Sequence, residues 1–174
     1  MSDGSASYID AKGRTRWRGN DAVADRLKDL HDMLVIGGYD ASHAARYPRL
    51  GYLISRHPEP ITDLYRDDRL RAIPGVGGIV ETILREIITT GTCAKMTEPS
   101  PESNYEPPPV TVLEMTAVPG MGAKTARRLY VERGINSLAA LRDALASGAL
   151  DDFTGLGPKL RQAILSARTL PAGV

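Results

Sequence analysis

The sequence has little of the chemistry that marks disulfide-rich, zinc-binding or membrane proteins. It contains one cysteine, Cys93, and three scattered histidines among 174 residues. A single cysteine excludes an intrachain disulfide, and these residues lack the spacing of a thiolate zinc site. No run approaches the roughly 20 apolar residues that span a bilayer, and the N-terminus lacks the apolar stretch of a signal peptide. We therefore expect a cytoplasmic protein without a membrane partner.

Charge of one sign is also scarce, because the formal net charge is only +1. Affinity for a phosphate backbone comes mainly from Lys and Arg, so this value argues against a nucleic-acid partner. The local distribution differs from the average. Residues 1–92 hold 13 basic and 13 acidic side chains, residues 93–110 hold 1 and 3, and residues 111–174 hold 8 and 5. The positive charge therefore lies in the last third of the chain.

The hydrophobic pattern has helical period throughout, and no run alternates with period two, so we expect an all-α fold. In the first helix, Val23, Leu27, Leu30 and Leu34 recur at helical spacing, Asn20 is placed to cap it, and Gly37-Gly38 ends it. The other predicted helices cover 42–57, with Pro48 in the first ordered turn, then 59–65, 78–89, 110–116, 123–133 and 137–147, and a last pair flanks Gly155-Leu156-Gly157 and ends near Thr169.

Composition divides the chain into tandem helical domains joined by a linker. Residues 92–110 contain Pro99, Pro101 and Pro107-Pro108-Pro109, whose rings favour extended polyproline geometry over packing. The predicted parts are a flexible basic arm (1–19), a first helical domain (20–91), the Pro-rich linker (92–110), a second domain (111–170) and a tail (171–174). In the arm, the arginines around Trp17 either lie along a nucleic-acid strand or are simply solvated.

The most informative feature is an internal repeat. Ile73-Pro74-Gly75-Val76-Gly77, Val118-Pro119-Gly120-Met121-Gly122 and Phe153-Thr154-Gly155-Leu156-Gly157 each precede an amphipathic helix. The first glycine permits a tight turn, the apolar residue between the glycines fills the core, and the second glycine exposes backbone at a helix start. Unpaired N–H groups and the positive end of the helix dipole can bind an anion there. The alternative is a tight turn that serves packing alone.

Basic residues distinguish the three hairpins. The second is followed by several cations within two turns, the third by two, and the first by none before Arg85. The second hairpin is therefore the best phosphate site, the third is plausible, and the first is doubtful. The predicted DNA-binding residues are Gly75, Gly77, Gly120, Gly122, Lys124, Thr125, Arg127, Arg128, Gly155, Gly157, Lys159 and Arg161.

These segments resemble the helix-hairpin-helix motif, which holds DNA phosphates through backbone N–H groups without reading bases. Over residues 20–170 the order of elements is similar to the N-terminal part of family X DNA polymerases, the 8-kDa-type domain followed by the fingers. The resemblance is carried by the Tyr47 segment, by "RLRAIPGVGG" leading to "TTG", by "LEMTAVPGMGAKTARRLYVERGINSLAAL", and by "GALDDFTGLGPKL".

The resemblance implies that the first hairpin faces the downstream side of a DNA gap and the second faces the primer strand. It also implies that hairpin carbonyls can hold a monovalent cation, Na⁺ or K⁺. We expect no other cofactor. The carbonyls would come from Ile73 and Val76 in the first hairpin, and from Thr116, Val118 and Met121 in the second.

Two departures from the family predict that the chain is not an enzyme. No strand pattern carries the paired aspartates of a polymerase palm, and Asp67-Asp68 and Asp151-Asp152 fit solvated turns. The lysine that forms a Schiff base in the family's deoxyribose-phosphate lyase aligns with Ile83, and residues 78–89 contain no lysine.

The leading hypothesis is a non-catalytic DNA-binding module that contacts duplex, nicked or gapped DNA in repair or replication. One alternative is an abasic-site lyase that uses an unaligned lysine such as Lys124, although Lys124 fits a phosphate contact better. The other is a scaffold that recruits a separately encoded nucleotidyltransferase or repair protein, which the neutral first domain favours.

Overall fold

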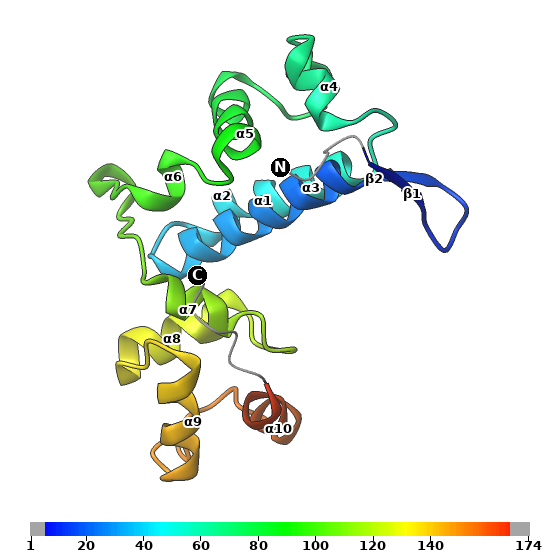
Figure 1. The fold of residues 1–174 in the computed structure, drawn as a ribbon. Helices are drawn as coiled ribbons and strands as arrows, with labels where there is room; N and C mark the ends of the chain where they lie inside the picture. The colour runs from blue at the N-terminus through cyan, green and yellow to red at the C-terminus, as the bar shows by residue number, and fades with distance from the viewer. Residues whose placement is uncertain (1–5, 168–174) are drawn as a thin grey trace.

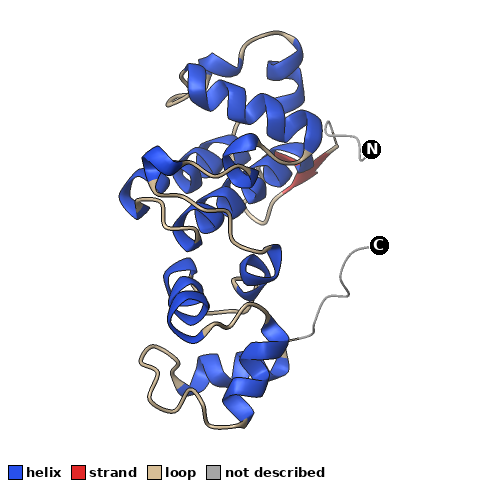
Figure 2. Ribbon diagram, turned by 90° about the vertical axis from the view of Figure 1, so that its left-hand side faces the viewer, coloured by secondary structure: helices blue, strands red, loops and turns tan. Residues whose placement is uncertain are grey.

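The computed structural model describes residues 6–167. The all-α prediction is confirmed, since helices form the body of the molecule and the described residues add one two-stranded sheet (Figures 1 and 2). The predicted tail at 171–174 and the helix end near Thr169 lie outside the described residues. The last helix, α10 (Pro158–Ser166), ends within them.

The predicted flexible basic arm is wrong for residues 6–17. Strands β1 (Ser7–Ile9) and β2 (Thr15–Trp17) pair antiparallel. Asp10 fixes their turn, because its carboxylate accepts the backbone N–H groups of Lys12 and Arg14 and the Arg14 guanidinium at 2.8–3.0 Å. These bonds lower the pKa of Asp10 to about 2. Arg14 and Arg16 thus have carboxylate partners inside the chain. Arg18 lies 5.3 Å from the centre of the Tyr8 ring, and Trp17 Nε1 donates to the Pro58 carbonyl at 2.9 Å.

Helix α1 (Arg18–Ile36) is the central helix of the first half and packs along α3 (Arg46–Ser55) (Figure 1). Asn20 lies inside α1 rather than capping it. Its buried amide donates to the carbonyls of Ile54 and Glu59 and accepts the Ile61 N–H at 2.6 Å. The remaining elements of this half are α2 (Ala41–Ala44), α4 (Ile61–Arg66), the 3-10 turn η1 (Leu70–Ala72) and α5 (Gly78–Thr90).

The Pro-rich segment is packed, not an extended linker. It contains α6 (Ala94–Thr97) and η2 (Pro101–Ser103), and it buries Cys93, Met96 and Tyr105. The Tyr105 hydroxyl donates to the Met96 carbonyl at 2.7 Å, and burial raises the pKa of Tyr105 to about 12. A Cβ on Gly37 would overlap the Tyr105 ring, so this glycine allows the segment to lie against the end of α1.

The second half consists of α7 (Val110–Met115), α8 (Ala123–Arg133), α9 (Leu138–Ala146) and α10. Residues 147–157 form turns, so the helix predicted just before Gly155 is absent. The two halves are in contact, because α1 packs against both α7 and α8 (Figure 1). Arg127 of α8 donates to the Ile36 carbonyl at the end of α1 at 2.6 Å. The hairpins of the two halves are therefore held in one arrangement.

Candidate functional site

The three glycine segments adopt the same turn. Gly75, Gly120 and Gly155 have φ values of +87°, +90° and +103°, a region that L side chains avoid. In the first two turns, the N–H of the residue after this glycine donates to the carbonyl two residues before the glycine, Val76 to Ile73 and Met121 to Val118. Val76, Met121 and Leu156 are buried, as predicted for core-filling residues.

The second glycine of each turn has no structural need to be glycine. Gly77, Gly122 and Gly157 precede α5, α8 and α10 with φ values of −100°, −88° and −67°, which any residue can adopt. In the described chain no atom lies within 4 Å of a Cβ built on any of them. No side chain caps these three helices. Each helix therefore presents bare backbone and unpaired N–H groups to the outside.

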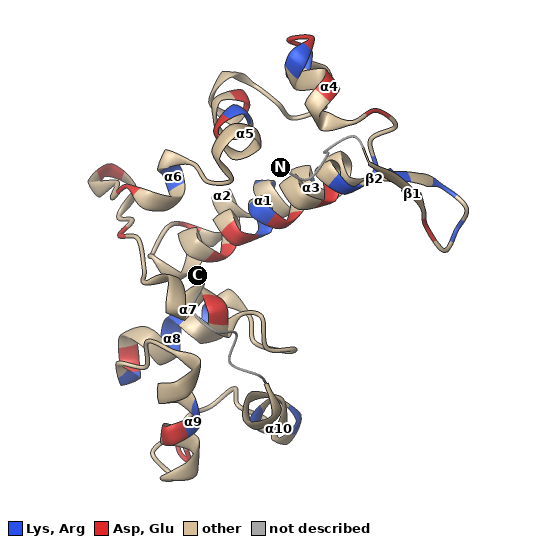
Figure 3. Ribbon diagram, in the orientation of Figure 1, with Lys and Arg blue, Asp and Glu red and all other residues tan. Residues whose placement is uncertain are grey.

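Two predicted cations remain free at these helix starts. Lys124 and Lys159 hold the same position, two residues after the second glycine, and both are exposed. Within residues 6–167 neither forms a hydrogen bond, an ion pair or a ring contact. Most other basic side chains have carboxylate partners, and Figure 3 shows acidic and basic residues interspersed along α1. The two unpaired lysines therefore lie at the helix starts of the second and third hairpins.

Three predicted DNA-binding arginines form hydrogen bonds within the protein. Arg127 bonds to Ile36 between the two halves. Arg128 donates to the Thr154 carbonyl at 2.9 Å and lies 4.5 Å from the centre of the Phe153 ring. Arg161 donates to two carbonyls of its own hairpin, Leu150 at 2.8 Å and Leu156 at 2.9 Å. The sequence predicted correctly that these arginines lie on helices. The acceptors of Arg127 and Arg128 lie 91 and 26 residues away, too far along the chain to be predicted.

The second and third hairpins contact each other reciprocally. A Cβ on Gly120, in the second turn, would lie 3.7 Å from Leu160 of α10. A Cβ on Gly155, in the third turn, would lie 3.7 Å from the Arg128 guanidinium of α8. Each turn therefore rests against the helix that follows the other turn, and the two hairpins form one unit.

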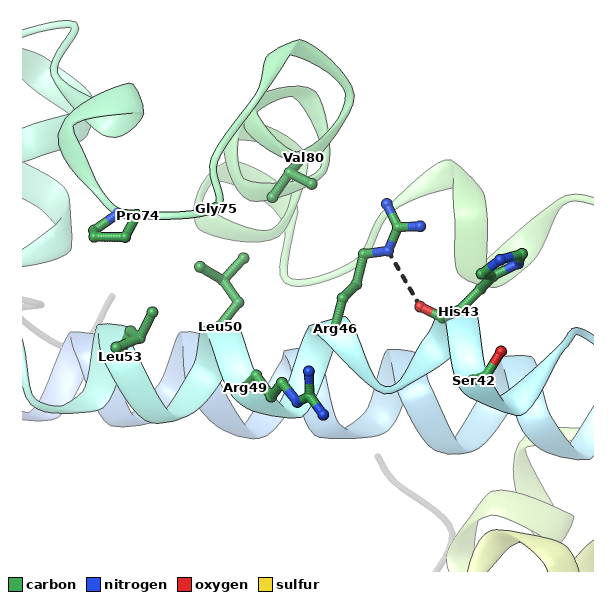
Figure 4. Close-up of a pocket in the computed structure, with 9 residues that line it drawn as sticks. All are labelled: Ser42, His43, Arg46, Arg49, Leu50, Leu53, Pro74, Gly75 and Val80. Carbon is green, nitrogen blue, oxygen red and sulfur yellow. Dashed lines mark hydrogen bonds between the residues drawn. The ribbon is translucent and has the colours of Figure 1, made fainter.

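Basic residues of helix α3, which is distant in sequence, lie beside the first hairpin. A cavity of about 310 Å³ lies between its turn and α2–α3, lined by His43, Arg46, Arg49, Pro74 and Gly75 among others (Figure 4). Arg46 bonds only to a backbone carbonyl, and Arg49 forms no hydrogen bond or ion pair with the described residues. The sequence interpretation missed these arginines because it counted only cations after the glycines.

The first hairpin also differs from the other two at its surface. Ile79 occupies the position of Lys124 and Lys159 and is 76% exposed. In the same helix, Ile83 is buried at the position aligned with the family's lyase lysine. Of the paired acids that precede hairpins, Asp68 pairs with Arg85, Asp151 with Arg161, and Asp152 with Arg133.

Two of the carbonyl groups predicted to hold a monovalent cation, those of Ile73 and Val118, have acceptor capacity left over. The Ile73 and Val118 carbonyls each accept one turn hydrogen bond and retain a second lone pair. Hard carbonyl oxygens suit a hard cation. The third hairpin differs, because the Arg161 guanidinium covers the Leu156 carbonyl, which corresponds to those of Val76 and Met121.

Comparison with known proteins agrees with this geometry. Residues 112–154 match the SAM-like helix-hairpin-helix tandem. The chain is also 25% identical over 100 residues to the DNA polymerase/3′-5′ exonuclease PolX of Bacillus subtilis. That match covers 58% of this chain and 17% of the relative, so the chain corresponds to less than a fifth of it. The helix-hairpin-helix part is thus related to X-family polymerases.

Residues 6–167 contain no group of three His, Cys, Asp or Glu side chains that could hold a metal ion. No described helix has both the length and the apolar character needed to cross a membrane.

Proposed function

We propose that this chain is a non-catalytic DNA-binding module whose hairpins hold the phosphate backbone. The observation that carries the proposal is the glycine at positions 77, 122 and 157, which neither backbone geometry nor packing requires. A glycine at such a place allows a ligand to approach the backbone closely. The unpaired N–H groups and the helix dipole favour an anion.

The free charges support a phosphate ligand. Lys124 and Lys159 stand beside the second and third glycine turns, and Arg46 and Arg49 stand beside the first. Contacts of this kind position a protein on DNA without reading its sequence. Because the second and third hairpins form one unit, they are suited to bind neighbouring phosphates together. A bound Na⁺ or K⁺ on the carbonyls of the first two hairpins would add positive charge next to the phosphate.

The relative's name describes a polymerase and exonuclease, but the residues of this chain support a binding role. Helix α5 contains no lysine, and the aligned position is the buried Ile83. The adjacent acid pairs that could suggest a metal site are engaged with arginines. We infer that the module serves repair or replication and prefers nicked or gapped DNA, which binding to matched intact, nicked and gapped duplexes would test.

Charge reversal at the two free lysines tests the phosphate site. The variant Lys124→Glu with Lys159→Glu should bind duplex DNA at least about tenfold more weakly at low salt, and its salt dependence should fall by nearly two counterions. The matched control reverses Lys12 and Arg26, which lie outside the three hairpins, so that the net charge changes equally. Equal affinity of the two double variants would show that total charge, not the hairpins, controls binding.

A protein partner is the second candidate for the first hairpin, because Ile79 is strongly exposed where the other hairpins carry lysine. The candidate partner is a separately encoded nucleotidyltransferase or repair protein. Ile79→Lys separates the two functions. If the first hairpin holds DNA, the added cation should strengthen duplex binding. If the hairpin docks a protein, the substitution should leave DNA binding unchanged and weaken the protein complex.

A further inference from the structure

A cavity lies beside the second hairpin, where the two halves of the chain meet. Its volume is about 510 Å³, and its walls come from α1, α2 and the start of α8. The lining residues with ionisable side chains are His31 of α1 and Lys124 of α8. Gly122 also lines the cavity, so the bare backbone at the start of α8 borders it. The first half of the chain therefore faces the place where we put a phosphate.

The position of the two walls relative to each other is fixed by Arg127. Its guanidinium joins α8 to the end of α1 through the 2.6 Å hydrogen bond to the Ile36 carbonyl. His31 lies on α1 within two turns of Ile36. A side chain of α1 can therefore serve as a fixed partner for a ligand at the start of α8.

The ring of His31 is oriented by a carboxylate. Its Nδ1 lies 2.8 Å from one oxygen of Asp32, and the other oxygen accepts the Lys28 ammonium at 2.7 Å. Asp32 is only 6% exposed, so its direction is set by these two partners. An ionised carboxylate can only accept hydrogen bonds, so Nδ1 carries the proton when the ring is neutral. The other ring nitrogen, Nε2, is then an acceptor.

A second proton changes what His31 offers to a phosphate. In the neutral ring, the Nε2 lone pair opposes the lone pairs of a phosphate oxygen. In the imidazolium ring, Nε2–H donates, and a charge-assisted hydrogen bond of this kind is among the strong ones. A phosphate nearby favours the charged ring in turn. Binding of a phosphate and binding of a proton to His31 are therefore coupled, and each strengthens the other.

The other charged groups near the cavity do not supply this coupling. Ser42 lines the cavity, but its hydroxyl donates to Asp40. That bond, with the His43 N–H, lowers the pKa of Asp40, which keeps this carboxylate ionised. His43 lines the cavity of the first hairpin instead. Among the described residues, neither the arginines of α3 nor Glu114 of α7 lines the cavity. His31 is thus the group placed to gain a charge there.

We propose that His31 is a phosphate ligand of the second hairpin, and that protonation of its ring tightens this site as the pH falls. The inference rests on the proposed function, because it assigns a further residue and a regulation to the same site. A DNA strand held there would touch both halves of the chain, with α8 and Lys124 on one side and His31 on the other.

The test measures the affinity for a short DNA duplex at constant ionic strength at about pH 6 and about pH 8, on either side of the range in which imidazole ordinarily titrates. From the higher to the lower pH, the affinity of the wild type should rise at least about tenfold more than that of His31→Gln, as expected for one hydrogen bond between charged groups. The control His57→Gln removes a histidine outside the cavity and should respond to pH as the wild type does. Equal pH responses of the wild type and His31→Gln would overturn the proposal.

The ¹⁵N spectrum of the histidine rings gives a measurement that needs no variant. Adding the duplex at neutral pH should move the His31 signals toward those of the doubly protonated ring, and unchanged signals would contradict the proposal. Duplex binding by Lys124→Glu with Lys159→Glu is measured alongside. If that variant binds weakly while His31 does not respond, this inference alone fails; if it binds as tightly as its matched control, the proposed function fails as well.

Discussion

Replacing Gly122 with alanine should weaken DNA binding without weakening the fold. The φ of −88° suits alanine, and no atom of the described chain lies within 4 Å of the added Cβ. Alanine is a poorer helix N-cap than glycine by about 0.5–1 kcal/mol. The loss of chain entropy in the unfolded state returns about 0.4–1 kcal/mol. The free energy of unfolding should therefore change by no more than about 0.5 kcal/mol.

The effect on binding should be much larger. The new methyl group projects into the space where we place a phosphate, and it keeps the anion from the backbone N–H groups of α8. Losing one hydrogen bond to a charged group is worth about 1.5–3 kcal/mol, which corresponds to about ten- to 150-fold in affinity. Thermal unfolding and fluorescence anisotropy with a labelled duplex measure the two quantities on the same sample.

The matched control is Gly120→Ala, two residues earlier. Gly120 has φ +90°, and alanine there is strained by about 1–2 kcal/mol. We expect this variant to lose stability, in contrast to Gly122→Ala. If Gly122→Ala binds duplex DNA as tightly as the wild type, the backbone at the start of α8 is not a phosphate site, and the reasoning from its glycine is refuted.

Three other predictions concern the parts around the hairpins. Arg127→Ala removes the 2.6 Å hydrogen bond to Ile36 and should lower the free energy of unfolding by about 1.5–3 kcal/mol. It should leave the number of counterions released on DNA binding unchanged. A salt titration in which the variant releases one counterion fewer than the wild type would show that Arg127 contacts DNA. Asp10 has its pKa lowered to about 2 by Arg14 and backbone N–H groups, so its stabilisation is present above the ordinary carboxyl pKa near 4 and is lost as the pH falls through about 2. Melting temperatures of the wild type and Asp10→Asn should therefore differ at neutral pH and converge on acidification, and a constant difference would contradict this role. Borohydride treatment with abasic DNA should trap no covalent adduct, because α5 offers no lysine and Ile83 is buried; an adduct, most tellingly at Lys124, would support the lyase alternative.

The sequence was most informative where a local pattern repeats. The two glycines and the apolar residue between them depend on backbone geometry within a few residues, so the repeat predicted three equivalent turns, and the structure has them. Helix limits were also close, as for α8, where 123–133 was predicted and Ala123–Arg133 is found. These features depend on short-range interactions that the sequence displays directly.

The features that the sequence missed are strands too short to show a pattern and contacts with partners far along the chain. The strands β1 and β2 are three residues long, too short to show alternation, and their turn depends on one carboxylate, Asp10. Prolines in residues 92–110 suggested an extended linker, but Tyr105 finds a place against Gly37 that only the fold creates. Likewise, Arg46 and Arg49 reach the first hairpin from a helix that lies more than twenty residues upstream.

The most direct test of the phosphate-binding hairpins is the response of individual backbone amides to DNA. A ¹⁵N-resolved NMR titration with a short duplex at low salt would follow every N–H group of the chain. The account predicts that the largest shifts fall on the first amides of α8 and α10, at Ala123, Lys124, Thr125, Lys159 and Leu160, and that raising the salt reverses them. Shifts concentrated on other surfaces, with these amides unchanged, would contradict the claim that the hairpins hold the DNA backbone.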